Sequence, residues 1–424
     1  MTLTTDTAGL DLSRFLRPGD RIVWGHACGE PTTLVQALIA QAERIGPVAA
    51  FAATSFSGLL DVTAADRIAF SSMGAIGSLR ALAEAHRLGI VPCHVGQVAA
   101  MIEQGLIGCD AAFVQVSPPD AAGNHSFGLI GDFVATAVRK ARVVIAEVNE
   151  RVPFTLGDAT LPAARIDCAV QVSRDPVEVS AAPIGATDLA IARHAAAYVE
   201  DGAAIQVGIG AVPDAILRLL RDRKDLGVHS GMMGDGLVDL VEAGVVSNAR
   251  KPIDPGVSIT GALIGTKRLY AFADRNPSMQ MRNSAYTHDA TVLSRLPKLV
   301  TINSAVEVDL TGQVNAEQSG PLYLGGTGGQ VDFVRAGARS PGGRSIIALP
   351  ATARGGKVSR ISASLSGPVT TARSDVDVIV TEFGAAELKG KTLAERTRRL
   401  VAIAHPAFQQ ALDIAAHDIR KRGY

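Results

Sequence analysis

The second half of the sequence carries two side chains, those of Glu307 and His229, that could move protons or attack a carbonyl group. Glu307 and Asp309 alternate with aliphatic residues in segment 306–310, Val-Glu-Val-Asp-Leu, so a strand there would place both carboxylates on one face. His229 carries an imidazole, whose ordinary pKa of ~6.5 suits proton exchange near neutrality. Glu307 and His229 are therefore the candidate catalytic residues, as nucleophile or as base for water. Each also has a structural interpretation, as a hydrogen-bond acceptor or as a residue that orients its loop.

Two glycine-rich segments could bring backbone amides close to a ligand. Gly208 and Gly210 lie between a predicted strand and a helix that begins near Pro213, and a helix start leaves amide groups free for an oxyanion or phosphate. A dinucleotide fingerprint needs a third glycine where Pro213 stands, which disfavours a dehydrogenase. Segment 325–330, Gly-Gly-Thr-Gly-Gly-Gln, loses much conformational entropy when it folds. Such a segment is expected where the backbone must adopt positive φ or approach another group closely. A tight turn and a surface loop are the alternatives without a ligand.

The elements that would position these residues follow an alternating pattern. Residues 143–146 and 376–380 are predicted buried strands, and residues 33–42 and 213–220 have helical spacing. Such alternation of Val/Ile-rich runs with helical segments is typical of α/β layers with largely parallel sheets.

The two halves also repeat one plan. Segments 19–25 and 202–208 each predict a strand ending in glycine, followed by a proline, Pro31 or Pro213, near the start of a helix. This match indicates an internal duplication.

Two further pairs of segments extend the match. Segment 114–117 pairs with 306–309, which makes Gln115 the counterpart of Glu307, and Glu147 and Glu382 each close a Val/Ile strand pattern.

The segment 173–187 contains prolines, a glycine and small residues that interrupt the pattern. We therefore predict two domains, residues 1–186 and residues 187–424. An ordinary loop within one large domain is the alternative.

Composition narrows the functional class. The chain has 424 residues, 47% of them hydrophobic, with 41 Lys+Arg and 41 Asp+Glu, so no long-range field attracts nucleic acid or an anionic membrane. The N-terminus lacks the pattern of a secretory signal, and no apolar run has the length of a membrane span. The four cysteines form no C-x-x-C pair, so neither a metal site nor a disulfide framework is predicted. We expect a reduced cytoplasmic protein.

The sequence resembles the acetyl-CoA hydrolase/transferase family, which includes the 4-hydroxybutyrate CoA-transferases. The resemblance is carried by segments 208–213, 306–310 and 325–333, and by shorter segments at 116–120, 147–149, 235–236, 239–240, 242–244, 332–335 and 380–384. It implies two duplicated open α/β domains with largely parallel sheets, similar to the NagB/RpiA-like domains of class I CoA-transferases.

The resemblance also implies a site for a CoA thioester. It would be lined by segment 208–213, the first glycine turn, and by segment 325–330, the glycine loop. Backbone amides there would stabilise the oxyanion, an arrangement worth ~3–4 kcal/mol in the transition state. The residues of this sequence that correspond to the family's site are Val207, Gly208, Gly210, Gly326, Gly328 and Gly329.

The family's nucleophile is missing from this sequence. Family members carry a glutamate directly after a His-Ser or His-Thr pair and shortly before Asp-Gly, and its carboxylate forms an acyl anhydride and then a glutamyl-CoA thioester. Here His229-Ser230 and Asp235-Gly236 are present, but Gly231 occupies the glutamate's position. The covalent route of the family is therefore closed at this residue.

Three functions follow as alternatives. The first is an acyl-CoA enzyme that hydrolyses or otherwise converts a CoA thioester without a glutamyl-CoA intermediate, with Glu307 or His229 as base. The second is a ping-pong CoA-transferase, between an acyl-CoA and a small carboxylate, that uses Glu307 as a displaced nucleophile. The third is a non-catalytic CoA-binding protein. Each needs no metal and no permanently bound cofactor, since CoA enters as part of the substrate, and the resemblance implies a homodimer or higher homo-oligomer.

Overall fold

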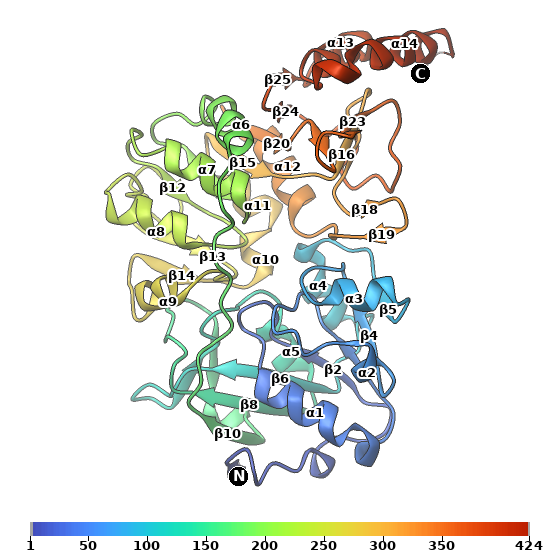
Figure 1. Cartoon of the computed structure of the whole chain (residues 1–424). Helices are drawn as coiled ribbons and strands as arrows, with labels where there is room; N and C mark the ends of the chain where they lie inside the picture. The colour runs from blue at the N-terminus through green and yellow to red at the C-terminus, as the bar shows by residue number, and fades with distance from the viewer. Residues whose placement is uncertain (1–2, 423–424) are drawn as a thin grey trace.

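The chain folds into two α/β halves, each built around its own mainly parallel sheet (Figure 1). The structure is a computed structural model and describes residues 3–422. The first half holds an eight-stranded parallel sheet in the order β1 (Leu3–Thr5), β10 (Cys168–Val172), β8 (Val143–Asn149), β6 (Ala111–Val116), β2 (Arg21–Trp24), β3 (Val48–Phe51), β4 (Ile68–Ser72) and β5 (Leu88–Ile90).

Helices and short elements complete this half. They are η1 (Leu12–Arg14), α1 (Thr32–Ile45), α2 (Val62–Ala65), α3 (Leu79–Glu84), α4 (Val95–Glu103), the antiparallel pair β7 (Asn124–Ser126) and β9 (Thr160–Pro162), α5 (Val134–Lys140) and η2 (Ala163–Arg165). The predicted helix at 33–42 is α1, and the predicted strand at 143–146 lies within β8.

The second half holds a six-stranded sheet that is parallel except at its last pair. Its order is β12 (Gly227–Val228), β11 (Ala204–Val207), β15 (Leu299–Asn303), β20 (Arg344–Ala348), β24 (Val378–Thr381) and β25 (Gly384–Glu387). Its helices are α6 (Ala186–Ala196), α7 (Ala211–Leu219), α8 (Asp235–Glu242), α9 (Lys267–Ala273), α10 (Ser284–Thr287), α11 (Ala290–Leu293), α12 (Gln330–Arg339), α13 (Leu393–Ala402) and α14 (Pro406–Arg422). Small sheets are formed by β13 (Ser258–Thr260) with β14 (Met279–Met281), β16 (Glu307–Asp309) with β17 (Val314–Asn315) and β23 (Ile361–Ser362), β18 (Gln318–Ser319) with β19 (Leu322–Tyr323), and β21 (Thr352–Ala353) with β22 (Val358–Ser359).

The two large sheets share one strand order. The run β10-β8-β6-β2-β3 in the first corresponds to β24-β20-β15-β11-β12 in the second. The helices agree as well, because α1 follows β2 as α7 follows β11, and α5 connects β6 to β8 as α12 connects β15 to β20. The strand, glycine and helix unit repeated in the sequence is thus the central strand of each sheet with the helix that follows it.

The other two sequence matches were wrong in their pairing. Segment 114–117 includes the end of β6, whose equivalent is β15, whereas Glu307 lies in β16 within a separate small sheet. Glu147 lies in β8, whereas Glu382 follows β24, the equivalent of β10. Short Val/Ile motifs recur in every buried strand, so similarity alone paired strands that occupy different places.

The large sheets lie on either side of the predicted domain boundary. Residues 173–185 form an extended connection that is neither helix nor strand, and the next element, α6, packs against α7 of the second half (Figure 1). The boundary after residue 186 places α6 in the second domain and stays a prediction.

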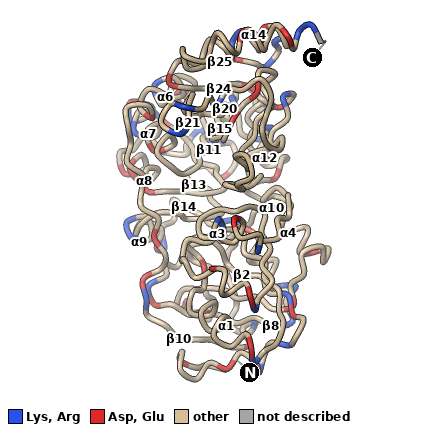
Figure 2. Tube along the Cα trace, turned by 45° about the vertical axis from the view of Figure 1, so that its right-hand side comes forward, with Lys and Arg blue, Asp and Glu red and all other residues tan. Residues whose placement is uncertain are grey.

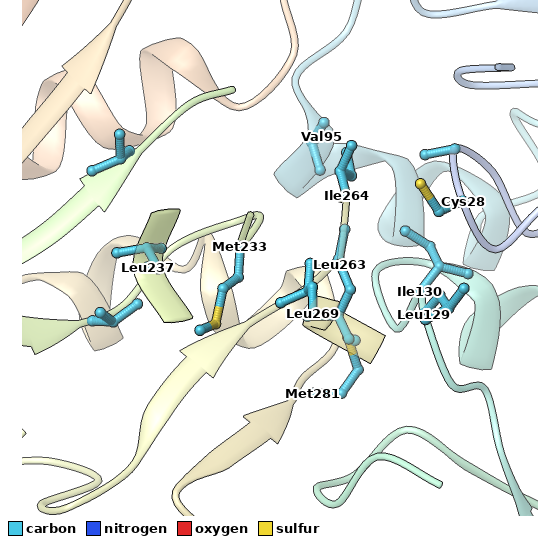
Figure 3. Packing of buried hydrophobic residues seen from close by; sticks show 14 of the residues in the cluster. Cys28, Val95, Leu129, Ile130, Met233, Leu237, Leu263, Ile264, Leu269 and Met281 are labelled. Carbon is cyan, nitrogen blue, oxygen red and sulfur yellow. The ribbon is translucent and has the colours of Figure 1, made fainter. Parts of the chain in front are cut away.

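An apolar core joins the two halves. One cluster of buried hydrophobic residues includes Val95 and Ile130 of the first half together with Met233, Ile264 and Leu269 of the second (Figure 3). Backbone hydrogen bonds cross the same boundary, at Ala75 N to Gly325 O (2.8 Å), Val95 N to Gly328 O (2.9 Å), Gly131 N to Gly261 O (2.8 Å) and Leu263 N to Leu129 O (2.8 Å).

Charged residues of both signs are interspersed along both halves (Figure 2), in keeping with the equal totals in the sequence. Within residues 3–422, no helix is both long and apolar enough to cross a bilayer.

One contact between the halves requires glycine on both sides. Gly74 and Gly326 form an isolated antiparallel bridge. A Cβ atom on Gly74 would lie 2.4 Å from the carbonyl oxygen of Gly325 and 2.7 Å from the Cα atom of Gly326. Both obstacles are backbone atoms, so a side chain at position 74 would force the halves apart.

Gly74→Ala is therefore expected to lower the free energy of unfolding by about 1–3 kcal/mol, the usual cost of overpacking. The matched control is Gly89→Ala, where the nearest atom to a new Cβ, the Phe70 carbonyl oxygen, is 3.6 Å away. Urea unfolding of both variants checks the prediction, and equal midpoints would contradict it.

Candidate active site

The carboxyl ends of β11, β12 and β15 bring together the first glycine turn and the segment around Gly231. The amide of Gly208 donates to the carbonyl oxygen of Ile302 at 3.2 Å, at the end of β15. The hydroxyl of Ser230 donates to the carbonyl oxygen of Val207 at 3.4 Å. In α/β sheets ligands bind outside the carboxyl ends of strands, so this edge is the expected place for a site.

The first glycine turn adopts a conformation that favours glycine. Gly210 has φ of +119° and is the N-cap residue of α7, which begins two residues before the predicted start at Pro213. A cavity of about 380 Å³ adjoins the turn and is lined by Gly210, Arg218, Arg221 and Gly236, among others. Asp214, Asp235 and Asp239 also line this cavity, so the turn combines helix-start amides with side chains of both charges.

The glycine loop has a second role that the sequence did not reveal. Its residues Gly325 and Gly326 contact the backbone at Gly74 in the first half, and a Cβ on Gly325 would lie 2.4 Å from the carbonyl oxygen of Ala316. Gly329 is the N-cap residue of α12. Close backbone packing accounts for the glycines at 325 and 326, while Gly328 and Gly329 keep partial exposure at the start of the helix.

A histidine occupies the space into which a side chain at position 231 would project. A Cβ atom on Gly231 would lie 2.8 Å from both Cε1 and Nε2 of His288 and 3.4 Å from the ring of Phe333. From the other side, a Cβ on Gly329 would lie 2.5 Å from the same Nε2. The imidazole of His288 thus lies between the Gly231 segment and the glycine loop, which places these two predicted site segments next to each other.

Neighbouring residues hold this imidazole in place. Nδ1 of His288 is 2.8 Å from the hydroxyl oxygen of Thr287, and the ring centroid is 4.8 Å from that of Phe333. His288 carries no signal in the sequence, because no spacing links residues 231 and 288 and only packing brings them together.

Two carboxylates, also missed from the sequence, accompany the histidine. Oδ2 of Asp132 lies 3.0 Å from Nε2 of His26, and both side chains are buried. Asp332 on α12 accepts from the amide of Gly96 at 3.3 Å, and burial raises the pKa of its carboxyl group. Burial lowers the pKa of His288, while the charges of both carboxylates act in the opposite direction.

His229 lies in a different environment from the one expected of a base. Its side chain is fully buried, and its ring centroid is 5.9 Å from that of Tyr286. Neither ring nitrogen makes a hydrogen bond of normal geometry within the described residues. Burial lowers the pKa of His229 to about 3, so the ring is neutral and weakly basic at physiological pH.

Glu307 is buried in the small sheet formed by β16, β17 and β23. Its Oε1 atom accepts hydrogen bonds from Asn315 Nδ2 at 2.8 Å, from the Ser366 amide at 2.7 Å and from the Ser366 hydroxyl at 2.8 Å. Asp309 on the same strand accepts from the amide and hydroxyl of Thr311 and so closes a turn. These bonds match the structural interpretation of Glu307, as an acceptor that fixes neighbouring segments.

The described part of the chain has no cluster of side chains that could bind a metal ion. Among residues 3–422, no group of three or more His, Cys, Asp or Glu side chains is placed to hold a metal ion.

The contact between positions 231 and 288 predicts coupled effects on stability. Gly231→Ala is expected to lower the free energy of unfolding by about 1–3 kcal/mol, because the new methyl group meets the imidazole. In the His288→Ala background the same change should cost much less, since the ring is gone. A double-mutant cycle by urea unfolding measures this coupling, and additive effects would show that the two positions do not meet.

The buried neutral His229 predicts a dependence of stability on pH. Its folded-state pKa of about 3 lies below the ordinary value of 6.5, so the unfolded chain binds the extra proton as pH falls below about 6.5. His229→Phe removes this penalty and should reduce the loss of stability between pH 7 and pH 5 by up to about 2 kcal/mol. Unfolding curves at both pH values check this, and identical losses in variant and wild type would contradict it.

Matches to known proteins identify the family of this chain. The acetyl-CoA hydrolase/transferase N-terminal domain matches residues 11–181, and the C-terminal domain of that family matches residues 265–416. The 4-hydroxybutyrate coenzyme A transferase of Clostridium kluyveri is 40% identical over 396 residues, 92% of each chain. The crystal structure of RipA from Yersinia pestis has a TM-score of 0.91 at 34% identity, covering 99% of this chain and 98% of that one. The crystal structure of 4-hydroxybutyrate CoA-transferase from Porphyromonas gingivalis has a TM-score of 0.83 at 33% identity, with 99% and 98% covered. This chain therefore belongs to the acetyl-CoA hydrolase/transferase family of enzymes.

Proposed function

We propose that this enzyme hydrolyses an acyl-CoA thioester without forming a glutamyl-CoA intermediate at position 231. The observation that carries the proposal is the imidazole of His288 in the space where a side chain at 231 would project. The imidazole of His288 fits in this space because residue 231 is glycine. The candidate site therefore has an imidazole nitrogen where the family resemblance places a carboxylate.

The two glycine segments support the same reaction. The amide of Gly210 lies at the carboxyl edge of the second sheet, where the amide of Gly208 is already bonded to Ile302, and Gly328 and Gly329 lie at the start of α12. Amides in such positions stabilise the oxyanion that forms when a thioester carbonyl is attacked. Arg218 beside the first turn offers positive charge for a phosphate of CoA, whereas Arg221 already lies 3.7 Å from Asp239.

A CoA-transferase with Glu307 as nucleophile is the second candidate. The name of the Clostridium kluyveri relative, a transferase at 40% identity, favours it. The hydrogen bonds converging on Oε1 of Glu307 weigh against it, because they stabilise the ground-state carboxylate and hold the side chain in its own sheet. As part of the proposal, CoA is supplied only with the substrate, and the protein acts as a homodimer or higher homo-oligomer.

The test is release of CoA thiol from a panel of acyl-CoA esters, in water alone and with added small carboxylates. The wild type is expected to release thiol in water alone, at a rate that added carboxylates do not raise. Thiol release that requires a carboxylate, together with a borohydride-trapped adduct on Glu307, would establish the transferase instead.

A double substitution that removes the imidazole at 288 and adds a carboxylate at 231 gives a further prediction. Gly231→Glu alone is expected to be poorly folded, since the new side chain meets the imidazole, whereas Gly231→Glu combined with His288→Ala has room for the carboxylate. The double variant should gain transfer to carboxylates and a hydroxylamine-sensitive glutamyl adduct. A folded double variant that binds CoA esters but forms no adduct would show that position 231 does not face the thioester.

A further inference from the structure

We propose that His288 is the general base of this enzyme, and that its Nε2 atom removes the proton from the water molecule that attacks the thioester carbonyl. The inference rests on the proposed hydrolysis and assigns the residue that performs it. In the sequence His229 and Glu307 were the candidates, and His288 was not among them.

The imidazole of His288 lies next to two glycines of the candidate site, Gly231 and Gly329. Nε2 of His288 lies within 2.8 Å of the point where a Cβ on Gly231 would stand and within 2.5 Å of the equivalent point on Gly329. The backbones of Gly231 and Gly329 are partly exposed, although His288 itself is only 7% exposed. The basic edge of the ring therefore lies directly behind two glycines that have no side chains to cover it.

Hydrogen bonding fixes which ring nitrogen is free. The Thr287 hydroxyl is 3.5 Å from the carbonyl oxygen of Asn283, to which it can only donate. The same hydroxyl oxygen therefore accepts from Nδ1–H of His288 at 2.8 Å. A neutral imidazole with its proton on Nδ1 has an unshared pair on Nε2, the atom that faces the two glycines.

Burial lowers the pKa of His288, and the charges of two nearby carboxylates partly offset this effect. The titratable groups facing the imidazole are Asp132 before α5, Asp332 on α12, His94 at the start of α4 beside Asp332, and His229 after β12. The two carboxylates favour the imidazolium, whereas burial favours the neutral ring and lowers its pKa. Neutral His229 adds no charge, because its own pKa is far below neutrality.

The step balances without a further reactant. Nε2 takes one proton from water while the water oxygen bonds to the thioester carbon, and the carbonyl electrons move onto oxygen as an oxyanion held by backbone amides. The oxyanion then re-forms the carbonyl, the C–S bond breaks, and the proton on Nε2 passes to the leaving thiolate. The products are a carboxylic acid and CoA thiol, and His288 returns to its neutral form.

The kinetic test compares His288→Gln and His288→Ala with His405→Gln. His405 contacts Phe383 and Phe408 near the C-terminus and serves as the matched control. His288→Gln is expected to lower kcat by about 10²–10⁴-fold, the usual contribution of a general base, while the control keeps wild-type kcat.

The acid limb of the pH profile, expected below pH 6.5 because burial lowers the pKa of His288, should disappear in His288→Gln. Added imidazole should partly restore His288→Ala, which a merely space-filling ring would not allow.

A second measurement does not depend on turnover. Nitrogen-15 NMR of histidine-labelled protein, with His288→Gln used to assign the signal, is expected to show a neutral ring protonated on Nδ1 at pH 7. An Nε2–H tautomer would overturn the assignment. Unchanged turnover and pH profile in His288→Gln would overturn the base assignment alone, whereas absence of thiol release by the wild type would overturn the proposed function together with it.

Discussion

The architecture depends on a close approach of two backbones that no side chain interrupts. The glycine loop of the second half lies against the first half at Gly74, and backbone hydrogen bonds from Ala75 and Val95 hold its carbonyl groups. These contacts fix the start of α12, and with it Gly329 and Phe333, on one side of the imidazole of His288. Because the same loop joins the halves and borders the candidate site, the contact between the halves also sets the geometry of the candidate site.

The fold could be predicted from the sequence because local patterns of residue types specify its strands, turns and helices. Val/Ile runs, proline near helix starts and the repeated glycine turn predicted two α/β halves with mainly parallel sheets, which the structure and the family membership confirm. The pairing of Glu307 with Gln115 was wrong, because alternation of residue types does not reveal which sheet a strand joins. Glu307 lies in a small sheet that has no counterpart at Gln115.

The site was accessible to prediction only in part. Glycines are conspicuous in a sequence, and Gly231 stood out against the flanking His229 and Asp235. His288 carried no such signal, since its significance comes from a contact made by packing. The glycine loop shows the converse limit: its composition indicated a close approach, but not that Gly325 and Gly326 approach the other half of the protein.

The shared space between residues 231 and 288 has a consequence for how such sites diverge. A side chain at 231 and the imidazole at 288 compete for the same space, so a change at 231 alone requires the ring to move. Among homologous chains the two positions are expected to vary together, with glycine at the first wherever the second is histidine. A substitution at either position is then tolerated best when the other position changes with it.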